Sequence, residues 1–245
     1  MFHTVVIGGG CLGAAAAISL QRKLNKSGKK DKVCLIEKAV LCAAESSRHS
    51  GIVRSANADP DASLMASMST KMWKNLSSVW GIDMELDEFG AIWIAKKNSD
   101  GENPAWTELS QRMEKIELIF QEIDTKSATE KCGTTLLTDE DESYFYEPEA
   151  FQLDPSILRS TLYDALESNG VELMEKTEVD TILTKGNEII GVTTNNGKIN
   201  AKNFVNATGA WSSQLFSKIG LKIPVTIEPV SVVNWMESPK QIRYE

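Results

Sequence analysis

The sequence predicts an α/β fold in which one sheet-containing domain is interrupted by a smaller α+β insertion. Residues 4–8, "TVVIG", form a β-branched run that stops at a glycine, as buried parallel strands do. A second apolar run, residues 32–37, ends in an acid. The same combination of a helical segment with strand-like runs returns after residue 150, beyond a stretch with a different pattern.

The first three elements form a strand–helix–strand unit. We expect a strand at 4–8, a helix at 11–25 and a strand at 32–37. The alanines at 14–17 keep the first turns of the helix slim, so that it can pack close to a sheet. A crossover of this kind is right-handed.

The middle of the chain changes in pattern. Alternation and a glycine predict either two strands or one bulged strand at 83–97. Apolar spacing predicts a helix at 60–80 that Asp61 caps. The remaining expectations are a loop with a short helix at 38–59, an amphipathic helix at 103–123, a short helix at 127–133 and an extended aromatic segment at 143–152.

The sheet pattern resumes with a well-marked helix at 153–170. Asp154 is placed to cap it, Pro155 takes its first position and Asn169-Gly170 ends it. Strand patterns follow at 171–176, 178–185, 187–194 and 198–211, with hairpin turns at "KGN" and "NNG". We therefore assign residues 1–80 and 150–215 to one discontinuous domain, and 81–149 and 216–245 to part of a second.

Composition argues against nucleic acid and a membrane as partners. The 245 residues carry a net charge of -8, which repels phosphate backbones. No stretch reaches the ~18 continuous apolar residues of a membrane helix, and the N-terminus lacks the pattern of a signal peptide. The four cysteines contain no C-x-x-C pair, and with only two histidines they predict no zinc site. Free thiols favour a cytoplasmic location.

The glycine turn Gly8-x-Gly10-x-x-Gly13 predicts a dinucleotide site. The first glycine allows the tight turn, the second lets the backbone approach a pyrophosphate, and the third lets helix and strand pack closely. Glu37 ends the second strand, where an acid binds a ribose hydroxyl. Cys11, at the helix N-terminus, is either a redox thiol or a small residue fitted beside the dinucleotide.

Four stretches together resemble the D-amino-acid oxidase superfamily, which includes sarcosine and glycine oxidases. They are "VVIGGGCLGAAAAISL" with "VCLIEK", "ESSRHSGIVRS", "LDPSILRSTLYDALESNGVEL" and "GKINAKNFVNATGAWSSQLFSKIGLKIPV". The last contains Ala207-Thr208-Gly209, which resembles the strand end beside the dinucleotide in FAD-binding Rossmann-like folds of the glutathione-reductase type. The resemblance implies that fold, with a discontinuous α+β substrate domain, and FAD as cofactor.

The resemblance also implies roles for individual residues. The glycines would hold the pyrophosphate, Glu37 the ribose, and the backbone of Val179 the adenine, while the serine-rich loop would lie along the flavin. The implied cofactor-binding set is Gly8, Gly10, Cys11, Leu12, Gly13, Glu37, Lys38, Ser46, Ser47, Arg48, His49, Ser50, Val179, Ala207, Thr208, Gly209 and Trp211.

Two residues carry sharper expectations from the same family pattern. Arg54 corresponds to an arginine that faces the substrate carboxylate, which it would bind through two parallel hydrogen bonds, unless it makes an ordinary surface ion pair. His49 lies near a position where some relatives attach the flavin covalently, and a non-covalent contact is the alternative.

The implied reaction is oxidation of an amine or amino acid by hydride transfer to flavin N5. A flavin-dependent 2-hydroxy-acid dehydrogenase and a non-catalytic nucleotide-binding subunit are the alternatives, with a purely nicotinamide-dependent dehydrogenase more distant. Family members continue well beyond this length, so we expect a truncated chain or a partner subunit that supplies the remainder.

Overall fold

The computed structural model describes residues 1–57, 59–133, 135–137, 139–229 and 241–243. The chain divides into two compact units. The first unit comprises Met1–His49 and Pro155–Val232, and the second comprises Ser50–Asp154 and Val233–Glu245.

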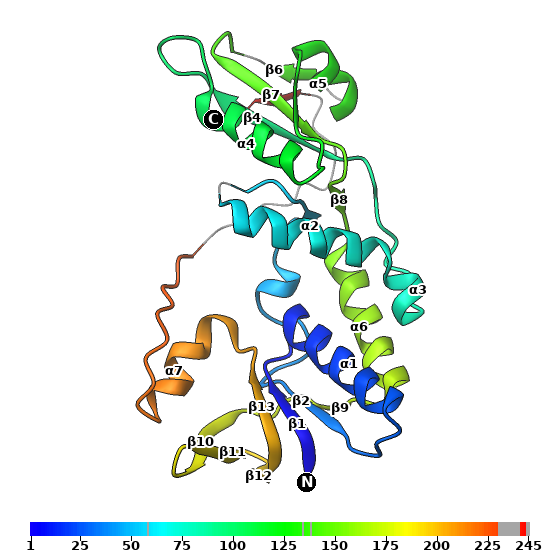
Figure 1. The fold of residues 1–245 in the computed structure, drawn as a ribbon, viewed down its shortest axis with the longest axis vertical. Coiled ribbons are helices and arrows are strands. Elements are labelled where there is room, and N and C mark those ends of the chain that lie inside the picture. Colours follow the sequence, from blue (N-terminus) through cyan, green and yellow to red (C-terminus); the bar gives the residue numbers. More distant parts are fainter. Residues whose placement is uncertain (58, 134, 138, 230–240, 244–245) are drawn as a thin grey trace. The chain divides into compact units, whose positions relative to one another are not determined.

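A four-stranded parallel sheet is the centre of the first unit, which confirms the α/β fold (Figure 1). Its order is β13 (Ala201–Asn206), β1 (Phe2–Ile7), β2 (Val33–Ile36) and β9 (Glu172–Met174). Val5 lies between Cys34 and Phe204 in register. All four residues of β2 are buried, as expected for an inner parallel strand.

Helices and a small second sheet complete the first unit. Helix α1 (Cys11–Lys26) packs beside α6 (Pro155–Asn169), and both are seen next to the parallel sheet in Figure 1. The antiparallel strands β10 (Val179–Lys185), β11 (Glu188–Thr194) and β12 (Gly197–Ile199) form the second sheet. Apolar residues of both sheets and of α7 (Ser212–Ser217) share one core.

The second unit is built on an antiparallel sheet of β4 (Ala91–Lys96), β7 (Glu142–Glu147) and β5 (Gln121–Ile123). Its core contains Trp93, Trp106, Phe120 and Phe145, whose ring centroids lie 5.4–6.1 Å apart. The other elements are β3 (Ile52–Val53), α2 (Pro60–Lys74), α3 (Leu76–Trp80), α4 (Pro104–Lys115), α5 (Thr125–Cys132), β6 (Thr135–Leu137), β8 (Phe151–Gln152) and β14 (Gln241–Arg243).

The unit boundaries differ from the domain limits expected from the sequence. Residues 50–80 belong to the second unit, because β3 pairs with β8 and the backbone at Ser55 bonds to Glu147. Conversely, Phe216 and Ile219 pack against the core of the first unit, although the sequence pattern places residues from 216 onward in the second domain.

Several expected elements are wrong in extent. The helix expected at 103–123 ends at Lys115; Glu117 has a positive φ of 60° and strand β5 begins at Gln121. Within 83–97 only β4 forms a strand longer than an isolated bridge. The helix expected at 60–80 breaks at Asn75, and Asp59 rather than Asp61 caps it, by accepting from the Ala62 N–H at 2.8 Å.

Candidate functional site

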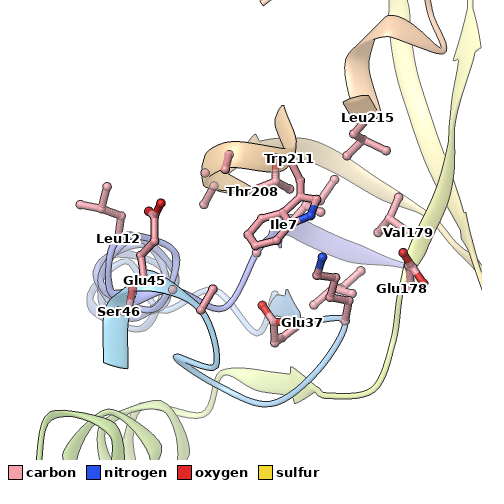
Figure 2. A pocket seen from close by; sticks show the side chains of 18 of the residues that line it. Ile7, Leu12, Glu37, Glu45, Ser46, Glu178, Val179, Thr208, Trp211 and Leu215 are labelled. Atoms are coloured by element: carbon pink, nitrogen blue, oxygen red, sulfur yellow. The ribbon is translucent and has the colours of Figure 1, made fainter. Parts of the chain in front are cut away.

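A pocket of about 520 Å³ lies at the carboxyl ends of β1, β2 and β13 in the first unit. Ile7 and Gly8 line it where β1 ends, Ile36 and Glu37 where β2 ends, and Ala207 just past the end of β13. This edge is where ligands bind in open parallel sheets, because the strand ends and helix N-termini converge there. In the view of Figure 2, Leu12 and Ser46 lie at one end of the pocket and Val179 and Leu215 at the other.

The glycine turn leaves no room for side chains at two of its three motif positions. Gly8 has a φ of +107°, and a Cβ there would lie 2.3 Å from the carbonyl oxygen of Ala207. A Cβ on Gly13 would lie 1.9 Å from the carbonyl oxygen of Gly8. Gly13 therefore serves helix–strand packing and is not among the residues that line the pocket. Gly10 does line it, and a Cβ there would meet only the Ser46 hydroxyl, at 3.1 Å.

The N-terminus of α1 opens onto the pocket through Gly10, Cys11 and Leu12. Gly10 is the N-cap and has no side chain to cap the helix, so the Ser46 hydroxyl accepts from the Cys11 N–H at 3.0 Å instead. The positive end of the helix dipole therefore faces the cavity. Such a terminus attracts the oxygens of a phosphate group.

Glu37 joins the glycine turn to the end of β2. One carboxylate oxygen accepts from the Gly9 N–H at 2.7 Å, and the other accepts from the Ala39 N–H at 2.8 Å. Each carboxylate oxygen has a further lone pair. The carboxylate lines the pocket (Figure 2), so it can accept hydrogen bonds from a ligand hydroxyl without losing its backbone donors.

The segment after β13 forms another wall of the pocket. Asn206 organises it, because its side-chain oxygen accepts from both the backbone N–H and the hydroxyl of Thr208, at 3.2 and 2.6 Å. The Lys38 ammonium lies 3.7 Å from the centroid of the Trp211 ring. This cation–π contact closes the wall against the end of β2.

The pocket lining is nearly balanced in charge. Its charged residues are Lys38 and Lys218 together with Glu37, Glu45 and Glu178. A phosphate-bearing ligand would therefore depend on backbone N–H groups and the helix dipole more than on cationic side chains.

Most of the expected cofactor-binding residues line this one pocket, but not all. Ser47 lines a second, smaller pocket beside α6, and Arg48 lines neither. Ser50 belongs to the second unit. The residues that line the main pocket as expected are Gly8, Gly10, Cys11, Leu12, Glu37, Lys38, Ser46, His49, Val179, Ala207, Thr208, Gly209 and Trp211.

Sequence reasoning missed the apolar and flanking parts of the lining. Ile7 and Ile36 directly precede predicted residues at two strand ends, so the strand pattern itself was a usable signal for them. Contributions from α7 had no comparable signal. The missed residues are Ile7, Ile36, Ala44, Glu45, Thr177, Glu178, Ala210, Gln214, Leu215 and Lys218.

His49 and Arg54 have different surroundings. His49 lines the pocket, and its Nε2 lies 3.1 Å from the carbonyl oxygen of Ser46. Arg54 belongs to the second unit, where its guanidinium carbon lies 4.4 Å from the Trp93 ring centroid and its Nη1 donates to the Ala56 carbonyl at 2.6 Å. The guanidinium is thus held by a ring and a backbone carbonyl of its own unit.

The cysteines of the first unit differ in burial. Burial raises the pKa of the Cys34 and Cys42 thiols to about 12 each. Cys11 is half-buried and lines the pocket. Within the described ranges, no three His, Cys, Asp or Glu side chains gather as ligands of a metal would. No helix in the same ranges combines the length and apolar character needed to cross a membrane.

Comparison with known proteins finds relatives named as an oxidase subunit and as a regulatory subunit. Sarcosine oxidase subunit beta of Rhizobium meliloti is 22% identical over 236 residues, which are 91% of this chain and 53% of that protein. The mitochondrial pyruvate dehydrogenase phosphatase regulatory subunit of Mus musculus is 27% identical over 213 residues, covering 87% of this chain and 23% of that protein.

A solved structure shows the same fold. The crystal structure of L-proline dehydrogenase from P. horikoshii matches with a TM-score of 0.78 at 26% identity, covering 93% of this chain and 58% of the other. The chain thus spans less than two thirds of the length of these relatives. A family model described as "FAD dependent oxidoreductase" (DAO) matches residues 3–242. The chain therefore belongs to the DAO family of FAD-dependent oxidoreductases.

Proposed function

We propose that the first unit binds the ADP half of FAD in the 520 Å³ pocket. The observation that carries the proposal is the meeting of three features at one sheet edge: the glycine turn, the open N-terminus of α1 and the Glu37 carboxylate. The turn and the helix terminus would hold the pyrophosphate, and Glu37 the adenosine ribose. Val179, Thr208, Gly209 and Trp211 would flank the adenosine.

We further propose that the protein oxidises an amine or amino acid. FAD, when bound, supplies the hydride acceptor for a C–H bond adjacent to nitrogen. Arg54 would bind the substrate carboxylate through its planar guanidinium, and His49 would contact the flavin without a covalent bond.

Uptake of FAD tests the first proposal. The protein, unfolded gently in chaotropic salt and refolded with excess FAD, is expected to retain ~1:1 flavin absorbing near 450 nm after desalting. Release of all flavin on acid precipitation would support a non-covalent contact between His49 and the flavin, whereas a yellow precipitate would mean a covalent bond. A colourless protein that takes up no FAD would contradict the proposal.

Substrate oxidation tests the second proposal. The flavin-loaded protein is mixed without oxygen with sarcosine, L-proline or 2-hydroxyglutarate, and loss of the flavin absorbance is followed. We expect bleaching by an amino acid. Bleaching by 2-hydroxyglutarate alone would favour the hydroxy-acid dehydrogenase instead.

A non-catalytic role is the second candidate, and one observation favours it. The Mus musculus relative is named as a regulatory subunit. Stoichiometric FAD that no amine, amino acid or hydroxy acid reduces would support this role.

We place the protein in the cytoplasm, on the basis of its free thiols. A fluorescent fusion that co-fractionates with a cytoplasmic marker would support this location, and recovery in an oxidising compartment would contradict it.

A further inference from the structure

Within the second unit, Arg54 is held by an aromatic ring and a backbone carbonyl. Its guanidinium stacks on Trp93, and the edge of that indole is fixed by contacts with Trp106 and Phe120 at centroid distances of 5.6 and 6.1 Å. Its Nη1 also donates to the Ala56 carbonyl. The position of the guanidinium therefore depends on two things: the indole, and the backbone at residues 55 and 56.

Both supports converge on one buried carboxylate. Glu147, on β7, is only 1% exposed. One of its oxygens accepts from the backbone N–H groups of Ser55 and, at 3.2 Å, Ala56. The other accepts from the indole Nε1–H of Trp93 at 3.2 Å. Glu147 thus holds the indole under the guanidinium and the backbone that receives its hydrogen bond.

Burying the Glu147 carboxyl group has a free-energy cost, and the groups that offset this cost show what Arg54 is left free to bind. A carboxyl group taken out of water needs hydrogen-bond donors to offset the loss of hydration. Here neutral N–H donors fill that need, and the Arg54 guanidinium bonds to a carbonyl and stacks on a ring. An arginine held in this way keeps its charge for a ligand and has lost much of its rotamer freedom beforehand.

We propose that Glu147 is a positioning residue that presents Arg54 to the carboxylate of the substrate. This inference rests on the proposed role of Arg54. Glu147 touches neither substrate nor cofactor in this scheme; it acts through Trp93 and through residues 55–56. A side-chain amide at position 147 offers one acceptor atom in place of two, so it can support the backbone or the indole but not both.

The Glu147→Gln variant tests the inference, with Glu142→Gln as the matched control. Glu142 lies on the same strand, is also buried, and accepts from the Tyr144 hydroxyl at 2.6 Å and from the Asp139 N–H. We expect Glu147→Gln to raise the KM of the flavin-loaded protein for L-proline about tenfold with kcat changed less than about twofold, as loss of uniform binding does. For pyrrolidine, which lacks the carboxylate, KM should not change.

A second readout needs no activity. The Trp93 indole N–H resonance, identified by its absence in Trp93→Phe, is followed by NMR while acetate is added as a carboxylate probe. In the unaltered protein acetate should shift it, because Arg54 lies on the ring. Glu147→Gln should move the starting resonance and weaken acetate binding about tenfold, whereas Glu142→Gln should do neither.

The two readouts separate failure of the inference from failure of the proposed function. Equal effects of Glu147→Gln and Glu142→Gln on acetate binding, or equal KM changes for L-proline and pyrrolidine, would overturn the positioning role. Absence of any amine oxidation alongside a selective acetate effect would instead overturn the proposed reaction. If Glu147→Gln does not fold, Trp93→Phe takes its place. It replaces the indole with a smaller aromatic ring that lacks the N–H donor, and it is expected to raise the KM for L-proline but not for pyrrolidine.

Discussion

The two compact units differ in the contacts that stabilise each of them internally. In the first unit, backbone meets backbone: the carbonyl groups of Gly8 and Ala207 lie where side chains at Gly13 and Gly8 would otherwise be. In the second unit, large rings fill the core, with Phe120 and Phe145 stacked 5.4 Å apart. Close backbone approach demands particular residues at particular positions, whereas ring packing tolerates several arrangements. The two units therefore respond differently to substitution.

The largest effect is expected from loss of a ring in the second unit. Phe145→Ala removes a 2%-exposed side chain and should lower the free energy of unfolding by about 3–5 kcal/mol. Urea denaturation measures the loss, and hydrogen exchange should locate it in β4, β5 and β7. Phe89→Ala is the control, because Phe89 is 57% exposed and its loss should cost less than about 0.5 kcal/mol. Equal losses from the two variants would show that the rings do not hold this unit.

The first unit is expected to fail through its backbone. In Gly13→Ala the new Cβ meets the Gly8 carbonyl oxygen at 1.9 Å, so the strand, turn and helix must separate. We expect a loss of about 3 kcal/mol, as severe overpacking causes, together with loss of FAD uptake. Thermal unfolding and the flavin absorbance of the refolded protein are the measurements.

Gly28→Ala provides the matched control for that variant. Gly28 follows α1 with a φ of +70°, but nothing lies within 4 Å of a Cβ there. It should cost only the ~1 kcal/mol of a left-handed alanine and leave FAD uptake intact. Normal FAD uptake by Gly13→Ala would contradict the close-approach role of the turn.

The difference between close backbone approach in the first unit and ring packing in the second explains how much of each unit the sequence could predict. The first strand and the two long helices of the first unit follow from local rules: a strand that stops at Gly8, a helix that starts beyond it, and Asn169-Gly170 as a stop signal. The close approaches at the turn allow few alternatives to glycine, so its glycine positions were identifiable. Glu37 was identifiable from its place at the end of a strand, and Thr208 from the resemblance to the family.

The second unit was harder because its pattern is ambiguous. Residues 116–123 continue a helical spacing, yet they turn at Glu117 and pair as β5 with β7. Nothing local specifies that pairing, which depends on ring packing between distant segments. For the same reason the Glu147 cluster could not be predicted: its donors come from residues 55–56 and 93, far away in sequence.

An intermediate effect is expected from the acid at the end of β2. Glu37→Gln keeps the size of the side chain but leaves the Gly9 or the Ala39 N–H without its acceptor. We expect about 1–2 kcal/mol of destabilisation and an FAD Kd raised at least about tenfold. Titration of the apoprotein with FAD measures the latter. An unchanged Kd would show that Glu37 serves the turn alone and does not contact the ribose.

The smallest effect should appear at high pH and should arise in the first unit, where Cys34 and Cys42 lie. Their pKa values are raised from 9.0 to about 12 by burial, so the folded protein keeps protons that the unfolded chain loses above pH 9. Because the unfolded state then binds fewer protons, stability falls as pH rises from 9 towards 12, by about 1 kcal/mol per thiol between pH 9 and 10.

Urea titrations at pH 9 and pH 10 measure this loss, which should be smaller in Cys34→Ala. Cys132→Ala, which removes the exposed thiol of the second unit, should change the slope less. A slope that neither variant alters would mean that high-pH unfolding starts at other groups than the buried thiols.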